Sequence, residues 1–100
     1  MGAKGAVGSG FNFAAPVYNR LLSAFARGDI AAARDEQFRG VQLIRLFSSP
    51  GYMAAAKATM GMLGVNVGPA RLPNSNLTLN QVTQLRRELE TMGFFDWIKL

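Results

Sequence analysis

The residues best suited to chemistry stand near the start of the chain, in the stretch GAKGAVGSGFN (Gly2–Asn12). This stretch places Ser9 and Asn12, whose side chains both donate and accept hydrogen bonds, among four glycines. Because glycine has no side chain, a ligand can come close to the backbone beside Ser9. The stretch looks like the end of a strand and the start of an active-site loop. The alternative is that the Ser9 hydroxyl satisfies a local backbone group.

The same glycines could also indicate a phosphate-binding loop, because backbone N–H groups near a helix N-terminus bind anions. Their spacing, G-x-x-G-x-x-G-x-G, matches neither familiar nucleotide-binding pattern, and no complete strand precedes it. We favour the simpler interpretation that small residues let a buried strand and the following turn pass close to other backbone.

Composition excludes several other kinds of site. The chain contains no Cys and no His, so it has neither a disulfide nor the residues of the common zinc sites and the usual general base. Its acidic neighbours, Asp35 with Glu36 and Glu88 with Glu90, point to different sides of predicted helices, unlike a catalytic carboxylate pair. We therefore expect no metal site and no cofactor.

Charge and hydropathy limit which classes of protein and which partners fit this sequence. Hydrophobic residues make up 49% of the 100 residues and charged residues 17%, which is typical of one globular domain. The net charge of +5 comes mainly from arginines dispersed over the predicted helices, so we expect no nucleic-acid binding. We also expect no membrane-spanning helix, no signal peptide and a cytoplasmic location.

The first half of the chain predicts one strand and two helices. Residues 5–8 form a very short buried strand, Pro16 stands in the first turn of a helix that stops at Gly28, and Asp29 caps a second helix that ends near Ser48. The expected inward faces are Val17, Leu21, Ala24 and Phe25 in the first helix, and Ile30, Ala33, Gln37, Val41 and Ile44 with Phe38 and Phe47 in the second.

The second half predicts two more helices. One covers Tyr52–Leu63, and an extended connection rich in Pro, Gly and Asn follows over Gly64–Asn76. Thr78 with Gln81 forms a capping box for the last helix. The tail FFDWIKL carries five large apolar side chains, so we expect it to dock on the rest of the chain or on a partner.

Three stretches together resemble a known family. GAKGAVGSGFN is similar to the eighth strand and loop of the N-acetylneuraminate lyases, which belong with dihydrodipicolinate synthase to the pyruvate-dependent class I aldolases. GDIAAARDEQ (Gly28–Gln37) resembles a helix opening of this family, and GPARLP (Gly68–Pro73) resembles its later connection. One such match would be weak, but three in the family's order cover most of the chain.

The resemblance implies a mainly α chain that is a fragment of a (β/α)₈ barrel: its last strand and helix (1–27), followed by three C-terminal helices (28–100). The family's activity is cleavage of N-acetylneuraminate to N-acetylmannosamine and pyruvate through a lysine Schiff base. Ser9 and Gly8 match the substrate-binding loop, where Ser9 would hydrogen-bond the sugar. Gly10 departs from the family's usual Thr, which puts the rigidity and substrate preference of this loop in doubt.

The resemblance also implies that essential parts lie outside this sequence. The Schiff-base lysine and the catalytic tyrosine belong to earlier strands, and neither Lys4, Lys57 nor Lys99 matches that lysine. We therefore expect no catalytic residue here, no aldolase activity from the chain alone, and sugar or pyruvate binding only in a complete barrel. The expected partners are a second copy or the N-terminal barrel portion. The alternative is a non-catalytic helical module for self-association or interaction.

Overall fold

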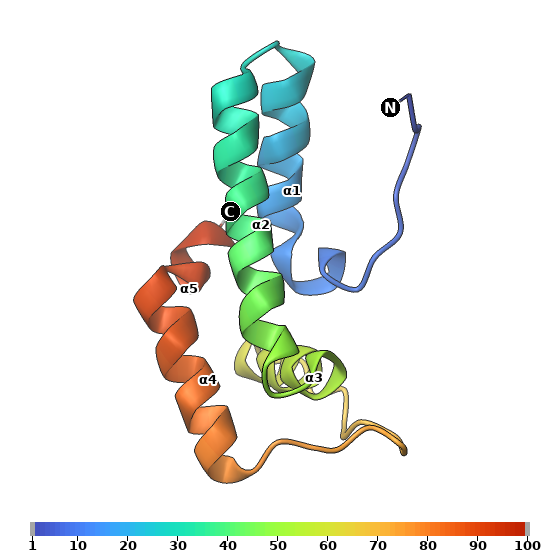
Figure 1. Ribbon diagram of the computed structural model, residues 1–100, viewed down its shortest axis with the longest axis vertical. Helices are drawn as coiled ribbons and strands as arrows, with labels where there is room; N and C mark the ends of the chain where they lie inside the picture. Colours follow the sequence, from blue (N-terminus) through green and yellow to red (C-terminus); the bar gives the residue numbers. More distant parts are fainter. Residues whose placement is uncertain (1, 100) are drawn as a thin grey trace.

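The computed structural model describes residues 2–99, which form helices and no strand (Figure 1). The first two helices run antiparallel, the third lies across the end of the second, the fourth contacts the third and the fifth, and the fifth contacts the first. The helices are α1 (Phe11–Ala26), α2 (Ile30–Ser48), α3 (Tyr52–Met62), α4 (Leu79–Met92) and α5 (Phe94–Trp97). In this described part of the chain, no helix combines the length and apolar character needed to cross a membrane.

The predicted helix ends of α2 and α4 are confirmed by their capping contacts. Asp29 accepts a hydrogen bond from the Ala32 backbone N–H at 3.1 Å, at the start of α2. Thr78 and Gln81 form both bonds of the capping box that opens α4. Gly93 ends α4 with φ 91°, a left-handed conformation that glycine adopts without steric cost.

Helix α1 begins earlier than the sequence predicts. It starts at Phe11, is interrupted at Ala14, whose φ and ψ are −123° and 21°, and continues with Pro16 as a helical residue. Proline fits the first turn of a helix, where its missing N–H leaves no bond unmade. The interruption therefore turns Pro16 into a first-turn residue of the regular part of α1, as its position in the sequence predicts.

The core lies where α1, α2, α3, α4 and α5 meet. Phe13 and Phe47 pack with ring centroids 5.1 Å apart, and Leu85 and Leu89 of α4 are buried in the same cluster. Phe94 is 0% exposed and completes it. The prediction that the C-terminal tail docks is thus confirmed for residues 94–98, whose apolar side chains pack in or against the core, and Leu100 lies outside the described residues.

The predicted strand at residues 5–8 is wrong in this structure. These residues have no regular secondary structure, and Val7 is fully exposed. A strand needs neighbours to pair its backbone groups, and residues 2–99 offer none. The predicted mainly α class is confirmed, whereas the predicted strand is absent from residues 2–99.

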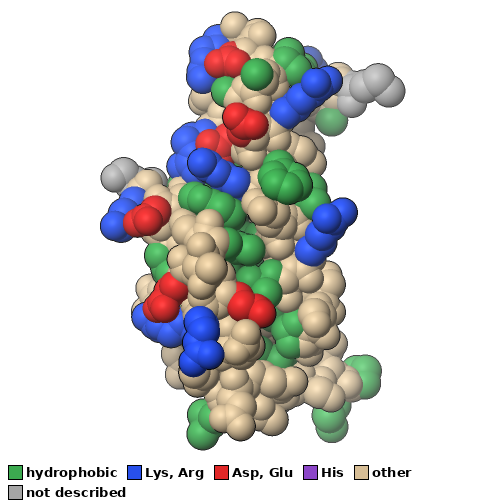
Figure 2. Space-filling view, turned by 60° about the vertical axis from the view of Figure 1, so that its left-hand side comes forward, with side chains coloured by type: hydrophobic (Ala, Val, Ile, Leu, Met, Phe, Trp, Pro, Cys, Tyr) green, Lys and Arg blue, Asp and Glu red, His purple; other side chains and the backbone are tan. Residues whose placement is uncertain are grey.

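The predicted inward faces of α1 and α2 are only partly correct. Val17, Ala24, Ala33 and Phe47 are buried, whereas Phe25 is 65% exposed. Hydrophobic side chains reach the surface among charged ones on the face seen in Figure 2. The exposed large apolar side chains of α1 and α2 are Leu22, Phe25, Ile30, Phe38 and Ile44. We call these five residues the apolar stripe.

Candidate functional site

Ser9 lies in the turn that leads into α1, and its side chain contacts a residue far away in sequence. The Ser9 hydroxyl donates a hydrogen bond of 2.9 Å to the Tyr52 hydroxyl on the first residue of α3. The turn is held by backbone bonds from Phe11 N–H to Gly8 O and from Asn12 N–H to Ser9 O, both 3.2 Å. The hydroxyl thus bonds a side chain of α3 and not a local backbone group, which was the alternative interpretation.

A surface hollow of about 430 Å³ opens beside Ser9, between the N-terminal turn, α1, α3 and the connection after α3. We call it the Ser9 hollow. Its polar lining consists of Ser9, Asn12 and Lys57, and its apolar lining includes Met53 and Met60. A ligand that carries hydroxyl groups on one side and an apolar group on the other matches this division, because each polar group can be paired while apolar area is buried.

The two glycines beside Ser9 have different surroundings. A Cβ atom at Gly8 would meet only the ring of Phe11, at 3.6 Å, and Gly8 is not among the residues that line the Ser9 hollow. A Cβ atom at Gly10 would lie 3.5 Å from the Tyr18 hydroxyl and 3.7 Å from the Tyr52 hydroxyl. The structure therefore brings Ser9 to the hollow and leaves Gly8 as part of the turn that supports it.

Tyr18 and Tyr52 were not predicted from the sequence as site residues. Burial raises the pKa of Tyr18 above its ordinary value of 10.0, and the nearby charge of ionised Tyr52 raises that pKa further. These tyrosines come from α1 and α3, so no local spacing relates them to Ser9. Only the packing of α3 against the start of α1 brings the three hydroxyl groups into one region.

Lys57 lies as expected for a single lysine within an apolar helix. It is partly buried, lines the Ser9 hollow and stands on a helix whose Ala54, Ala55 and Ala56 are buried. Such a lysine lays its stem on apolar surface and keeps its ammonium group near water. In the Ser9 hollow it supplies a positive charge and hydrogen-bond donors.

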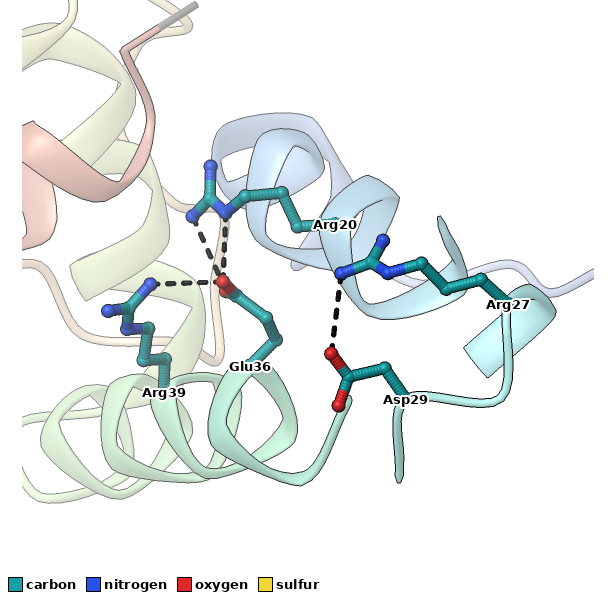
Figure 3. A network of polar contacts seen from close by, with 5 residues as sticks. All are labelled: Arg20, Arg27, Asp29, Glu36 and Arg39. Atoms are coloured by element: carbon teal, nitrogen blue, oxygen red, sulfur yellow. Dashed lines mark hydrogen bonds and ion pairs between the residues drawn. The ribbon is translucent and has the colours of Figure 1, made fainter. Parts of the chain in front are cut away.

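Glu36 forms ion pairs with two arginines and does not pair with a second carboxylate. Glu36, whose side chain is 12% exposed, bonds Arg20 of α1 at 2.9 Å and Arg39 of α2 at 3.1 Å (Figure 3). Arg39 also lies 5.3 Å from the centroid of the Trp97 ring. Among residues 2–99, no group of three or more His, Cys, Asp or Glu could hold a metal ion.

A second hollow, of about 440 Å³, has mostly apolar walls. It lies between the N-terminal segment and the α1–α2 pair, and its lining includes Ala6, Phe11, Tyr18, Leu22 and Gln37. Leu22 belongs to the apolar stripe and is 63% exposed. This side of the molecule offers apolar area and few hydrogen-bonding groups, so it suits packing against protein better than binding of a polar ligand.

Comparisons with known proteins agree with the sequence resemblance. The model of the dihydrodipicolinate synthetase family matches residues 1–92. The N-acetylneuraminate lyase of Mus musculus is 34% identical over 96 residues, which are 94% of this chain and 30% of that protein. The solved N-acetylneuraminate lyase structures from Proteus mirabilis and Aliivibrio salmonicida are 34% and 35% identical, each with a TM-score of 0.86 over 93% of this chain. The chain spans about a third of the length of these relatives.

Proposed function

The chain belongs to the dihydrodipicolinate synthetase family, and we propose that it is the C-terminal segment of a pyruvate-dependent aldolase of the N-acetylneuraminate lyase kind. The complete protein would cleave N-acetylneuraminate to N-acetylmannosamine and pyruvate through a lysine Schiff base. The observation that carries this proposal is the similarity to N-acetylneuraminate lyases over 93–94% of the chain, in sequence and in fold. The absence of Cys fits our further proposal of a cytoplasmic location.

Within this function we propose that Ser9 holds the sugar. Three observations support the role: the Ser9 hydroxyl lines a hollow, Asn12 and Lys57 line the same hollow, and its apolar wall could bury the acyl group of an N-acetyl sugar. Gly8 takes part through the turn, in which its carbonyl accepts the hydrogen bond of Phe11 N–H at 3.2 Å. Neither residue breaks or forms a covalent bond with the substrate in this proposal, and we assign no catalytic residue to the chain.

We propose that catalysis needs the barrel portion in addition to these residues. The resemblance implies that the Schiff-base lysine and catalytic tyrosine stand on earlier strands, and a Schiff-base lysine requires a desolvated pocket. The exposed segment at residues 5–8 and the apolar stripe give that portion a surface to cover. The chain would therefore dock by adding its N-terminal segment to the barrel sheet and by burying the stripe.

A reconstitution experiment tests this proposal. The chain is mixed with the part of the Proteus mirabilis N-acetylneuraminate lyase that its matched third does not cover, and cleavage of N-acetylneuraminate is followed by pyruvate release. We expect activity from the mixture and none from either part, with borohydride trapping pyruvate on a lysine of the added part. Trapping on Lys4, Lys57 or Lys99 would contradict our assignment of the lysines.

The role of Ser9 has its own measurement in the reconstituted enzyme. Ser9→Ala should weaken sugar binding by about 0.5 to 1.5 kcal/mol, which is the net contribution of a typical hydrogen bond. Pyruvate trapping should not change, because the proposed contact involves the sugar alone. An unchanged affinity for the sugar in the Ser9→Ala enzyme would remove Ser9 from the site.

The apolar stripe also favours a second candidate, a non-catalytic helical module that associates with itself. Leu22, Phe25 and Phe38 are each more than half exposed, so association of two chains could bury their apolar area. Sedimentation equilibrium at micromolar concentration should then give the mass of a dimer or larger assembly. A mass of one chain would contradict self-association, and activity on reconstitution would favour the aldolase segment over the module.

A further inference from the structure

We propose that Tyr52 is a positioning residue: the hydrogen bond between its hydroxyl and the Ser9 hydroxyl fixes the rotamer of Ser9, so that the Ser9 hydroxyl is held ready to bond a sugar hydroxyl in the Ser9 hollow. The proposal rests on the proposed function only in taking Ser9 to face the sugar. The contact between the two hydroxyls is a feature of the chain itself, with an oxygen–oxygen distance of 2.9 Å.

Ser9 and Tyr52 differ in how firmly the fold holds them in place. Ser9 stands in an exposed turn, whereas Tyr52 begins α3 and packs against the core cluster, with its ring centroid 5.8 Å from that of Phe47 in an edge-on arrangement. A hydrogen bond to a fixed acceptor limits the rotamers of an exposed side chain. The orientation of Ser9 is therefore set by α3, which lies 43 residues further along the chain.

The second step is the balance of donors and acceptors. A serine hydroxyl has one hydrogen to donate and two lone pairs that accept. The bond with Tyr52 uses one of these three positions, so Ser9 keeps two for a ligand in the Ser9 hollow. Lys57 and Asn12 supply donors on the same lining. A ligand hydroxyl can therefore bond Ser9 and accept from Lys57.

The third step is how close the hydroxyls lie to the turn. A Cβ atom at position 10 would be in ordinary van der Waals contact with the hydroxyls of Tyr18 and Tyr52, at 3.5 and 3.7 Å, so both hydroxyls lie beside the turn that carries Ser9. A Cβ atom at Gly40 would lie 3.1 Å from the Tyr18 hydroxyl. The raised pKa of Tyr18, caused first by burial and second by Tyr52, supports the proximity of the two tyrosines.

The test uses the chain alone and needs no ligand. Tyr52→Phe removes the accepting hydroxyl and keeps the ring beside Phe47, and Tyr18→Phe is the matched control because it removes the neighbouring hydroxyl. The readout is the pair of Hα–Hβ couplings of Ser9 in NMR spectra, which report its rotamer. We expect one rotamer in the wild type and in Tyr18→Phe, and averaged couplings in Tyr52→Phe.

Two results would overturn the proposal: unchanged Ser9 couplings in Tyr52→Phe, or averaging of equal size in Tyr18→Phe. If Tyr52→Phe does not fold, as judged by circular dichroism, the reciprocal variant Ser9→Ala decides. It should shift the ring resonances of Tyr52 more than those of Tyr18, and the absence of such a difference would overturn the proposal.

The reconstituted enzyme then tests whether the positioning of Ser9 affects sugar binding. Tyr52→Phe should raise the KM for N-acetylneuraminate about two- to tenfold, the range expected for one net hydrogen bond, and should change kcat much less. The double variant with Ser9→Ala should match Ser9→Ala alone, because Tyr52 acts through Ser9. Effects of the two variants that add would overturn the positioning role. Failure to reconstitute would count against the proposed function and leave the NMR result on Tyr52 standing.

Discussion

Replacing Glu36 by Gln should destabilise the chain far more than the same change at an exposed glutamate. Glu36 is 12% exposed at its side chain, and its carboxylate joins Arg20 of α1 to Arg39 of α2 at 2.9 and 3.1 Å. Gln has nearly the same shape and keeps one acceptor oxygen, so the change removes charge with little loss of packing. What remains is two arginines beside a neutral amide.

The magnitude follows from the exposure of the three side chains. Exposed ion pairs contribute about 0.2 to 1 kcal/mol, and breaking a buried pair costs about 3 to 5 kcal/mol. Glu36 is largely buried, but Arg20 and Arg39 are 39% and 38% exposed at their side chains, so water screens them in part. We therefore expect Glu36→Gln to lower the free energy of unfolding by about 1 to 2 kcal/mol, between these limits.

Urea unfolding followed by Trp97 fluorescence measures this loss. A fall of the midpoint by about 1 M is expected, given slopes of about 1 to 3 kcal/mol per M for small proteins. Glu90→Gln is the matched control, because Glu90 and its partner Arg86 are 56% and 54% exposed at their side chains. Equal losses in the two variants would refute the reasoning that partial burial strengthens the Glu36 network. A Glu36→Gln loss that vanished in high salt would refute it as well.

Three further predictions concern burial, capping and ionisation. Phe94→Ala should cost about 3 to 5 kcal/mol in unfolding free energy, because Phe94 is 0% exposed, whereas Phe25→Ala at a 65% exposed position should cost far less; thermal unfolding of both variants compares them. Thr78→Ala should cost about 1 kcal/mol through loss of the cap of α4, measured by urea unfolding; a neutral result would contradict the capping box. Because burial and then Tyr52 raise the pKa of Tyr18 above 10.0, the folded state favours the protonated phenol, and stability present below pH 10 is lost as pH rises through the raised pKa. Tyr18→Phe should therefore lose less stability above pH 10 than the wild type, and an identical loss would contradict this effect.

Local signals in the sequence were sufficient to predict most of the helices. The Asp29 cap, the Thr78–Gln81 capping box and the Gly93 stop each act through neighbouring backbone, so their effect does not depend on the rest of the fold. The inward faces were harder to predict. Phe38 and Phe47 are both of a type suited to a core, and only the docking of α1 and α4 decides that Phe47 is buried and Phe38 exposed.

The candidate site was predictable only in its local part. Ser9 and Asn12 stand out because the glycines around them are unusual, whereas Tyr52 becomes a site residue through a contact across 43 residues. The strand prediction failed for a similar reason. Residues 5–8 have the composition of a buried strand, but a strand forms by pairing, and residues 2–99 contain no second strand.

Residues 5–8 and the apolar stripe expose apolar side chains that a partner could bury. Fully burying a large apolar side chain gains about 1.5 to 3 kcal/mol, so covering Val7 and the half-exposed side chains of the stripe would gain on the order of 5 to 10 kcal/mol. That gain is comparable to the whole folding free energy of a small domain, about 5 to 15 kcal/mol. Association through this face and the stability of the helices are therefore coupled. Because the turn with Ser9 directly follows residues 5–8, whatever pairs with that segment also fixes one edge of the Ser9 hollow.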